Sequence, residues 1–250
     1  MKTFYLYFLF YFLTGSYITP IIILLIAYLI LDRMYFGFMS EYIIEPVRRR
    51  KRIKALLKEL ELNRSNANSA LELGMLYFEG KKYGKSVEYL NRAKERIDNS
   101  ARLRAYMGMS YMEQRRYEEG REELLKALEI DNSVIYGLPY IYLIQYEMGK
   151  GQVDTGEVSR LEKSLDRFSN TENFYRRGRI YNKSGYKEKA REMFNLALIE
   201  YSYVQKKFRR PHRKWAFLSR FHKSPALSVL IIAVIIAVIL SGTVGFVLFK

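Results

Sequence analysis

The sequence predicts an all-α protein: a solenoid of helical hairpins, flanked at its N-terminal and C-terminal ends by transmembrane or membrane-embedded helices. Three observations predict this fold. A pattern of 34 residues recurs in the middle of the chain, which is typical of stacked helical repeats. Both ends of the chain carry long runs without a charged residue, and most of the net charge of +16 lies beside those runs.

Residues 1–45 are expected to form a membrane segment and a linker. No charged residue occurs from Phe4 to Leu31, and roughly 20 apolar residues cross a bilayer as a helix. A single helix of this length would extend about 42 Å, longer than the hydrocarbon core. The run is too long for a cleavable signal peptide and lacks a small-x-small cleavage site. Because Pro20 interrupts it, two alternatives stay open, a kinked span and a re-entrant hairpin.

Residues 46–64 are predicted to form a basic amphipathic helix. Ile53, Leu56, Leu57 and Leu60 are spaced i, i+3, i+4 and i+7, which places them on one helical face. This segment occupies the position of half a repeat ahead of the first full copy, so we expect it to cap the solenoid. Its cations are expected to contact anionic lipid headgroups; they are Arg48, Arg49, Arg50, Lys51 and Arg52.

Residues 65–204 contain the repeats. Segments 73–98 and 107–132 align at a spacing of 34 residues, and a further copy begins near residue 177. Between the second and last copies there is room for one divergent repeat, at about 133–170, which gives about four helical pairs. Small and aromatic residues recur at matching positions of the three copies: Gly74, Gly108 and Gly178; Tyr77, Tyr111 and Tyr181; Ala93, Ala127 and Ala197.

This pattern resembles the tetratricopeptide repeat (TPR), a helix-turn-helix unit, over roughly residues 46–204. The resemblance implies that the three glycines let the two helices of a unit approach closely, and that the tyrosines fill the space between units. It also implies that function lies in a concave groove lined by the first helix of each unit.

Projecting the groove positions of that family onto this sequence gives a candidate partner groove. Its first two units are apolar and rich in methionine, which suits the non-polar face of a partner helix. Its last unit is cationic and suits acidic residues of a partner. Alternatively, the chain's own flanking helices fill the groove. The candidate residues are Leu71, Met75, Phe78, Met109, Met112, Tyr175, Arg176, Arg179 and Lys183, with Ala105 and Asn182 at equivalent positions.

Residues 205–223 form a basic, aromatic juxtamembrane segment. We expect the last repeat helix to extend to Arg210 and Pro211 to break it. The mixture of cations with Trp215 and Phe217 is typical of a helix lying in a membrane interface; the alternative is a helix that covers the C-terminal end of the repeats. The cations assigned to the membrane surface are Lys206, Lys207, Arg209, Arg210, Arg213 and Lys214.

Residues 224–250 are expected to form a transmembrane helix. Ser224 is placed to cap it and Pro225 to occupy its first turn. About 24 apolar or small residues follow, enough to span with some tilt. Small residues recur every four positions along one face, which permits close helix packing; they are Ala233, Ala237, Ser241 and Gly245.

The distribution of charge argues against nucleic acid as a partner. Residues 65–200 carry 23 basic and 21 acidic residues, whereas a nucleic-acid-binding domain carries a positive stripe on its folded part. Cations beside apolar segments mark the cytoplasmic side of a membrane. The chain has no cysteine, and its two histidines, His212 and His222, lack neighbouring carboxylates in the sequence. We therefore expect no catalytic residue, metal, cofactor or small-molecule substrate.

The function expected from these features is that of a non-enzymatic, membrane-anchored TPR scaffold or adaptor that presents a protein-binding groove to the cytoplasm. The architecture and the lack of sorting signals favour a bacterial inner (cytoplasmic) membrane, and an organelle surface stays open as the alternative. Two alternatives stay open. One is a structural subunit of a membrane complex, assembled through its transmembrane helices. The other is a nucleic-acid or ribosome tether that uses the basic flanks.

Overall fold

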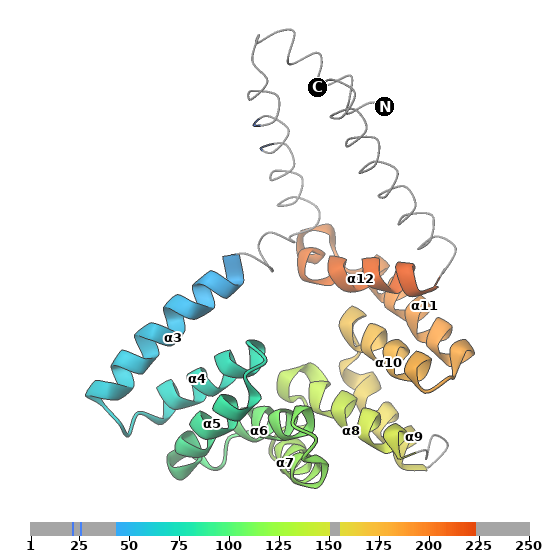
Figure 1. The fold of residues 1–250 in the computed structure, drawn as a ribbon. Coiled ribbons are helices and arrows are strands. Elements are labelled where there is room, and N and C mark those ends of the chain that lie inside the picture. Colours follow the sequence, from blue (N-terminus) through green and yellow to red (C-terminus); the bar gives the residue numbers. More distant parts are fainter. Residues whose placement is uncertain (1–21, 23–25, 27–43, 151–155, 224–250) are drawn as a thin grey trace, which may run out of the picture. The chain divides into compact units, whose positions relative to one another are not determined.

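A computed structural model describes residues 44–150 and 156–223, together with Ile22 and Ile26 (Figure 1). The chain divides into two compact units, Met1–Arg64 and Ser65–Lys250. Apart from the two isoleucines, the apolar segments predicted to enter the membrane lie outside the described residues, and so do Ala233, Ala237, Ser241 and Gly245. Among the helices that are described, none is both long and apolar enough to cross a membrane.

The first unit contributes helix α3, Glu45–Leu62. Pro46 occupies its first turn, where a backbone N–H is not needed. Glu45 in the same turn complements the positive end of the helix dipole. The five consecutive cations of residues 48–52 all lie in this helix, and all but the half-buried Arg49 are exposed. This helix lies within one or two residues of the predicted segment 46–64; its role as a cap on the repeats stays a prediction.

The described part of the second unit, residues 65–150 and 156–223, consists of four helical pairs and a final helix. Within each pair the two helices pack against each other, and α5 also packs on α6 and α7 on α8, so that successive pairs stack. This array confirms the all-α helical-hairpin fold. The pairs are α4 (Ala67–Glu79) with α5 (Tyr83–Ile97), α6 (Ala101–Glu113) with α7 (Tyr117–Ile130), α8 (Leu138–Gly149) with α9 (Gly156–Leu165), and α10 (Thr171–Lys183) with α11 (Lys187–Tyr203); α12 (Arg210–Lys223) follows.

Three of the pairs begin at an equivalent residue. In each, a side-chain oxygen at the N-cap accepts a hydrogen bond from the backbone N–H three residues later. This contact satisfies a donor that has no partner within the helix and stabilises it by about 1 kcal/mol. The three N-caps are Asn66 (3.2 Å to the N of Ser69), Ser100 (3.3 Å to the N of Leu103) and Asn170 (3.0 Å to the N of Asn173).

The first helix of each of these pairs also ends in the same way. A backbone N–H just past the helix donates to the carbonyl five residues earlier: Lys82 to Tyr77 (2.8 Å), Arg116 to Tyr111 (2.9 Å) and Tyr186 to Tyr181 (3.0 Å). The residue before each donor is left-handed, as the Schellman motif requires. These residues are Lys81 (φ 57°), Arg115 (φ 64°) and Gly185 (φ 88°).

Glycine at the crossing of the two helices is required by contact distance. A Cβ on Gly74 would lie 2.5 Å from Leu90 Cγ, and one on Gly108 would lie 2.7 Å from Leu124 Cγ. A Cβ on Gly178 would lie 2.6 Å from Phe194 Cε1. The predicted close approach is therefore confirmed in all three copies.

A buried hydroxyl joins the first pair to the second. Ser86 Oγ on α5 donates to the carbonyl of Gly74 on α4 (2.8 Å) and lies 3.0 Å from Ser110 Oγ on α6. Both serines are fully buried, so the contacts satisfy polar groups that water does not reach. The predicted inter-unit tyrosines, Tyr77, Tyr111 and Tyr181, are buried as well.

The third pair, α8 with α9, lies where the divergent repeat was predicted, and its start differs from the others. Ile135, Tyr136 and Gly137 all have positive φ (49°, 51° and 75°), and Pro139 then opens α8. The buried amide of Asn173 on α10 donates to the carbonyls of Tyr136 (2.9 Å) and Phe168 (3.1 Å). An amide from the fourth pair thus holds the loops at both ends of the third.

The C-terminal part of this unit differs from the sequence prediction. Helix α11 ends at Tyr203 and does not continue to Arg210, and Pro211 lies in the first turn of α12. Proline is tolerated there because a first-turn residue needs no N–H donor. Helix α12 packs on both α10 and α11, with Ala216 and Ser219 buried. The sequence analysis left two alternatives for this segment, a helix in the membrane interface and a helix that covers the end of the repeats. The packing of α12 is that of the second.

Candidate functional site

The first helices of the pairs form a row. Each of α4, α6, α8 and α10 contacts the next one in this series, and α10 contacts α12. The row therefore brings together residues that are far apart in the sequence, from the first pair to the last helix (Figure 1). In a helical-hairpin array this is the face on which a partner is bound.

The methionines projected onto this face are core residues instead. Met109 and Met112 are 0% and 7% exposed and belong to the core cluster that also contains Leu124 of α7 and Ile141 of α8. Ala105, at the equivalent position, is fully buried. A helix in the middle of the array has neighbours on three sides, so most of its positions face protein. The sequence analysis predicted an accessible groove wall of methionines, and this prediction is corrected for the second helical pair.

The other projected residues differ in accessibility. Leu71, Met75 and Phe78 of α4 are half-buried. Tyr175 of α10 is buried, with its ring 5.4 Å from that of Trp215 and 5.7 Å from that of His222, both on α12. The sequence analysis offered the alternative that the chain's own flanking helices fill the groove. At the last helical pair this is what is observed, because α12 covers Tyr175.

The cations predicted to line the groove at the last helical pair remain accessible. Arg179 and Lys183 are exposed and Arg176 is half-buried, and Asn182 beside them is exposed. Arg179 donates to the hydroxyl of Tyr175 (3.2 Å). These cations are accessible on α10, and their place at the end of a partner groove stays a prediction.

A strip of half-buried aromatic side chains runs along the row of first helices. We call it the aromatic strip; it consists of Phe78 of α4, Tyr106 of α6, Tyr142 of α8 and Trp215 of α12. Phe78 meets Tyr106 edge-on with ring centroids 5.3 Å apart. All four side chains pack against the main core cluster. Each one thus has a side fixed by the core and a side that is accessible.

Acidic side chains accompany the strip. The hydroxyl of Tyr142 donates to Glu113 Oε1 of α6 (2.9 Å). Burial, followed by the charge of Glu113, raises the pKa of Tyr142 above its usual value. Burial and then the charge of Glu79 raise the pKa of Tyr106 in the same way. Both hydroxyls are held in the neutral form and remain hydrogen-bond donors.

Arg176 of α10 contacts Trp215, the member of the strip that lies on α12. Its guanidinium lies 5.2 Å from the centroid of the Trp215 ring, and its Nε donates to Glu172 Oε1 (2.7 Å). A guanidinium over an indole face gains a cation–π attraction. Sequence reasoning found Phe78 and Arg176 but missed Tyr106, Tyr142 and Trp215, because the projection used one fixed set of positions. The signal that was available is that tyrosine and tryptophan usually keep their polar end accessible.

The cations of residues 206–214 that were assigned to the membrane surface divide into an exposed group and a half-buried group. Lys206, Lys207 and Arg210 are exposed. Arg209 instead donates to the carbonyls of Val204 (2.8 Å) and Ser202 (2.9 Å) and so closes the loop before α12. Arg213 and Lys214 are half-buried, with the Lys214 ammonium 4.9 Å from the Trp215 ring centroid.

Within 44–150 and 156–223 no group of three or more His, Cys, Asp or Glu side chains is placed to hold a metal ion. His222 is half-buried, between the rings of Tyr175 and Phe194, and its Nδ1 lies 2.9 Å from the carbonyl of Leu218. The neighbours of this imidazole are therefore aromatic rings and backbone.

The fold and the row of first helices define a helical-hairpin repeat protein. Residues 67–99, 101–134 and 171–198 match the family model of the tetratricopeptide repeat. These matched segments, which make up less than half of the chain, are similar to TPR units. The third helical pair lies between the last two matched segments, where the divergent copy was predicted.

Several solved structures are similar to this chain. Two crystal structures of MamA give TM-scores of 0.48 and 0.49 at 18% and 16% sequence identity; they cover 60% and 69% of this chain and 86% and 91% of theirs. The crystal structure of YrrB, described as a TPR protein with an unusual peptide-binding site, gives a TM-score of 0.45 at 16% identity, covering 72% of this chain and 98% of its own. No curated protein matches the sequence.

Proposed function

We propose that this chain is a non-enzymatic, membrane-anchored scaffold that binds a protein partner along the aromatic strip. The observation that carries the proposal is that Phe78, Tyr106, Tyr142 and Trp215 are only partly buried within the described part of the chain. Aromatic side chains that are fixed on one side and accessible on the other are typical of binding hot spots. Their rigidity lowers the entropic cost of binding.

The partner that suits this strip is an amphipathic helix or an extended peptide with some basic and some acidic groups. Its apolar side chains would pack on the aromatic rings. The exposed Glu79 and Glu113 beside the strip attract basic groups. At the other end, Arg179 and Lys183 attract acidic groups. The two ends thereby favour one orientation of the bound segment.

Membrane anchoring is the second part of the proposal. It is supported by the uncharged run from Phe4 to Leu31 and by the apolar segment from Pro225 to Phe249. The basic residues that flank these segments support a cytoplasmic position for the repeats. A bacterial cytoplasmic membrane is the location that we propose.

Site-specific crosslinking tests the proposed strip. A photoreactive phenylalanine analogue is placed at Tyr106 in the full chain, in its native membrane, and at Tyr203 as a control. Tyr203 lies at the end of α11 and is 78% exposed. A distinct adduct formed only from position 106, and lost when Tyr142→Ala is added, supports the strip. The same adducts from both positions, or none from position 106, would refute it.

A further inference from the structure

The turns between the two helices of a pair carry a repeated group of exposed side chains. We call these groups the turn tips; they are Lys81-Lys82-Tyr83, Arg115-Arg116-Tyr117 and Tyr186-Lys187. All five cations are exposed, and the tyrosines Tyr117 and Tyr186 are 47% and 40% exposed. No acidic residue occurs within the tips. Cations are therefore presented at three turns, and at two of them an exposed tyrosine accompanies them; Tyr83 of the first tip is half-buried.

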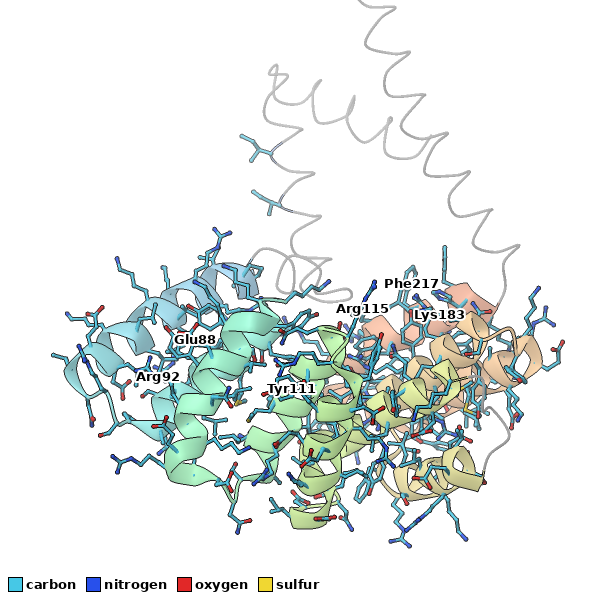
Figure 2. The ribbon with its side chains drawn as sticks, turned by 60° about the horizontal axis from the view of Figure 1, so that its bottom comes forward. Glu88, Arg92, Tyr111, Arg115, Lys183 and Phe217 are labelled. Carbon is cyan, nitrogen blue, oxygen red and sulfur yellow. The ribbon has the colours of Figure 1, made fainter. Side chains whose placement is uncertain are left out.

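The turn tips lie on one edge of the array. Helices joined by a short turn and packed together run antiparallel, so α4, α6 and α10 all point the same way, and their C-terminal ends meet at the same edge. Figure 2 shows Arg115 toward one side of this unit, where Lys183 at the end of α10 and Phe217 of α12 also lie. Phe217 is 44% exposed.

Two of the tips keep a cation where the backbone favours glycine. Lys81 and Arg115 have φ of 57° and 64°, whereas the equivalent residue of the last pair is Gly185. A side chain in this conformation is strained relative to glycine. Strain that a sequence keeps at an exposed turn points to a use for the side chain. Here the use is a positive charge that projects from the edge.

We propose that the turn tips contact the phosphate groups of an anionic bilayer, so that the array rests edge-on against the membrane. Lysine and arginine are attracted to anionic headgroups over about a Debye length. Tyrosine is enriched at the same depth because its ring is apolar and its hydroxyl is polar. This inference rests on the membrane anchoring proposed above, and it assigns a lipid contact to residues outside the two basic flanks.

Phosphate also occurs in nucleic acid, but the tips suit a lipid surface better. The second tip is followed by Glu118 and Glu119, and Arg116 is paired with Glu119. Carboxylates beside the cations repel the continuous phosphate backbone of a nucleic acid in a groove. A bilayer surface contacts side chains from one side only, and at this tip we assign that contact to the exposed Arg115 and Tyr117.

The natural absence of cysteine allows a direct measurement of distance. Full-length protein is reconstituted into vesicles of phosphatidylcholine with phosphatidylglycerol, carrying one donor dye on either Gly84→Cys or Asn99→Cys. Both sites are exposed, and nothing lies within 4 Å of a Cβ at Gly84. The two sites are separated by the length of α5, about 20 Å. Energy transfer to a headgroup-labelled lipid is then measured for each.

We expect transfer from position 84 to exceed transfer from position 99. The variant Lys81→Glu/Lys82→Glu/Arg115→Glu should remove most of that difference. The control variant Arg96→Glu/Lys163→Glu/Arg167→Glu changes three exposed cations outside the tips by the same charge and should retain it. Phosphatidylcholine alone should give a smaller difference than the anionic mixture.

Each alternative result overturns the proposal in a recognisable way. Protein that fails to float with the vesicles contradicts the membrane anchoring and this inference together. Protein that floats but shows equal or greater transfer from position 99 contradicts this inference alone. If the tip variant keeps the transfer difference and instead loses binding to a fluorescent single-stranded RNA in anisotropy measurements, the tips serve nucleic acid and the lipid contact is refuted.

Discussion

Arg104 of α6 and Glu123 of α7 form a nearly buried ion pair, with Nη1 3.0 Å from Oε2 and side chains only 12% and 10% exposed. Glu123 also accepts a hydrogen bond from the Lys94 ammonium of α5 (3.1 Å). Arg104 reaches back to Asp98, at the end of α5, with its Nη2 2.8 Å from Oδ2. One carboxylate thus ties the second helical pair to the first.

Removal of that carboxylate should destabilise the array. Glu123→Ala leaves the guanidinium of Arg104 in a largely water-excluded site without one of its two carboxylate partners, so we expect a loss of roughly 3 kcal/mol in the free energy of unfolding. Denaturant unfolding of the purified protein, followed by far-UV circular dichroism, measures it. Glu122→Ala, which removes an exposed partner of Lys126, should cost less than about 1 kcal/mol. Equal effects of the two variants would contradict the assignment.

Adding one methyl group at the helix crossing should also destabilise the second pair. In Gly108→Ala the new Cβ would lie 2.7 Å from Leu124 Cγ and 2.9 Å from the carbonyl oxygen of Gly120. Because backbone must move to accommodate it, we expect a cost of about 1–3 kcal/mol. The matched change Gly84→Ala is in a helix with open space around the Cβ and should stabilise by up to about 1 kcal/mol. A neutral Gly108→Ala would show that the helices are less closely packed than the structure indicates.

Two substitutions at the left-handed turn position, in different helical pairs, should have opposite effects on thermal stability. Gly185→Ala places a Cβ on a residue with φ of 88° and should cost about 1 kcal/mol. Arg115→Gly relieves the same strain at φ of 64° and should be stabilising or neutral. Thermal unfolding of both variants measures the sign. A destabilising Arg115→Gly would mean that the arginine side chain contributes contacts that outweigh the strain.

The amide of Asn173 should control the loop before α8. Asn173→Ala removes the donors to the carbonyls of Tyr136 and Phe168 and leaves both acceptors without this partner, at a cost of about 1–3 kcal/mol. Hydrogen exchange followed by mass spectrometry should show faster exchange at residues 134–141 and unchanged exchange in α5. Asn182→Ala, at an exposed position of the same helix, is the control. Unaltered exchange around Tyr136 would show that the loop holds its conformation alone.

The sequence allowed the repeats to be predicted more fully than the binding surface. Gly74, Gly108 and Gly178 recur because a Cβ does not fit at the crossing, so the physical constraint is visible directly in the sequence. The burial of Met109 depends on helices from three different pairs, and no local pattern contains that information. Pro211 was misread for a related reason: proline ends one helix and begins another, and the choice depends on where α11 stops.

The aromatic residues of segment 205–223 were compatible with two predictions, an interfacial helix and a helix that covers the repeats. Trp215 and Phe217 are two residues apart, and together with the cations they predicted an interfacial helix. In the structure Trp215 packs against the core cluster while Phe217 is exposed. Which of the two faces protein is decided by the contact of α12 with α10 and α11. That contact is long-range and leaves no periodic signal.

The cover provided by α12 has a consequence for assembly. Arrays of helical hairpins extend by stacking, and an uncovered last pair offers the same surface to a second copy as each pair offers to the next, which leads to open-ended filaments. Here the rings of Tyr175 and Phe194 are already in contact with Trp215 and His222. The place of a fifth hairpin is therefore taken, and head-to-tail growth from this end would first have to displace a helix of the chain itself.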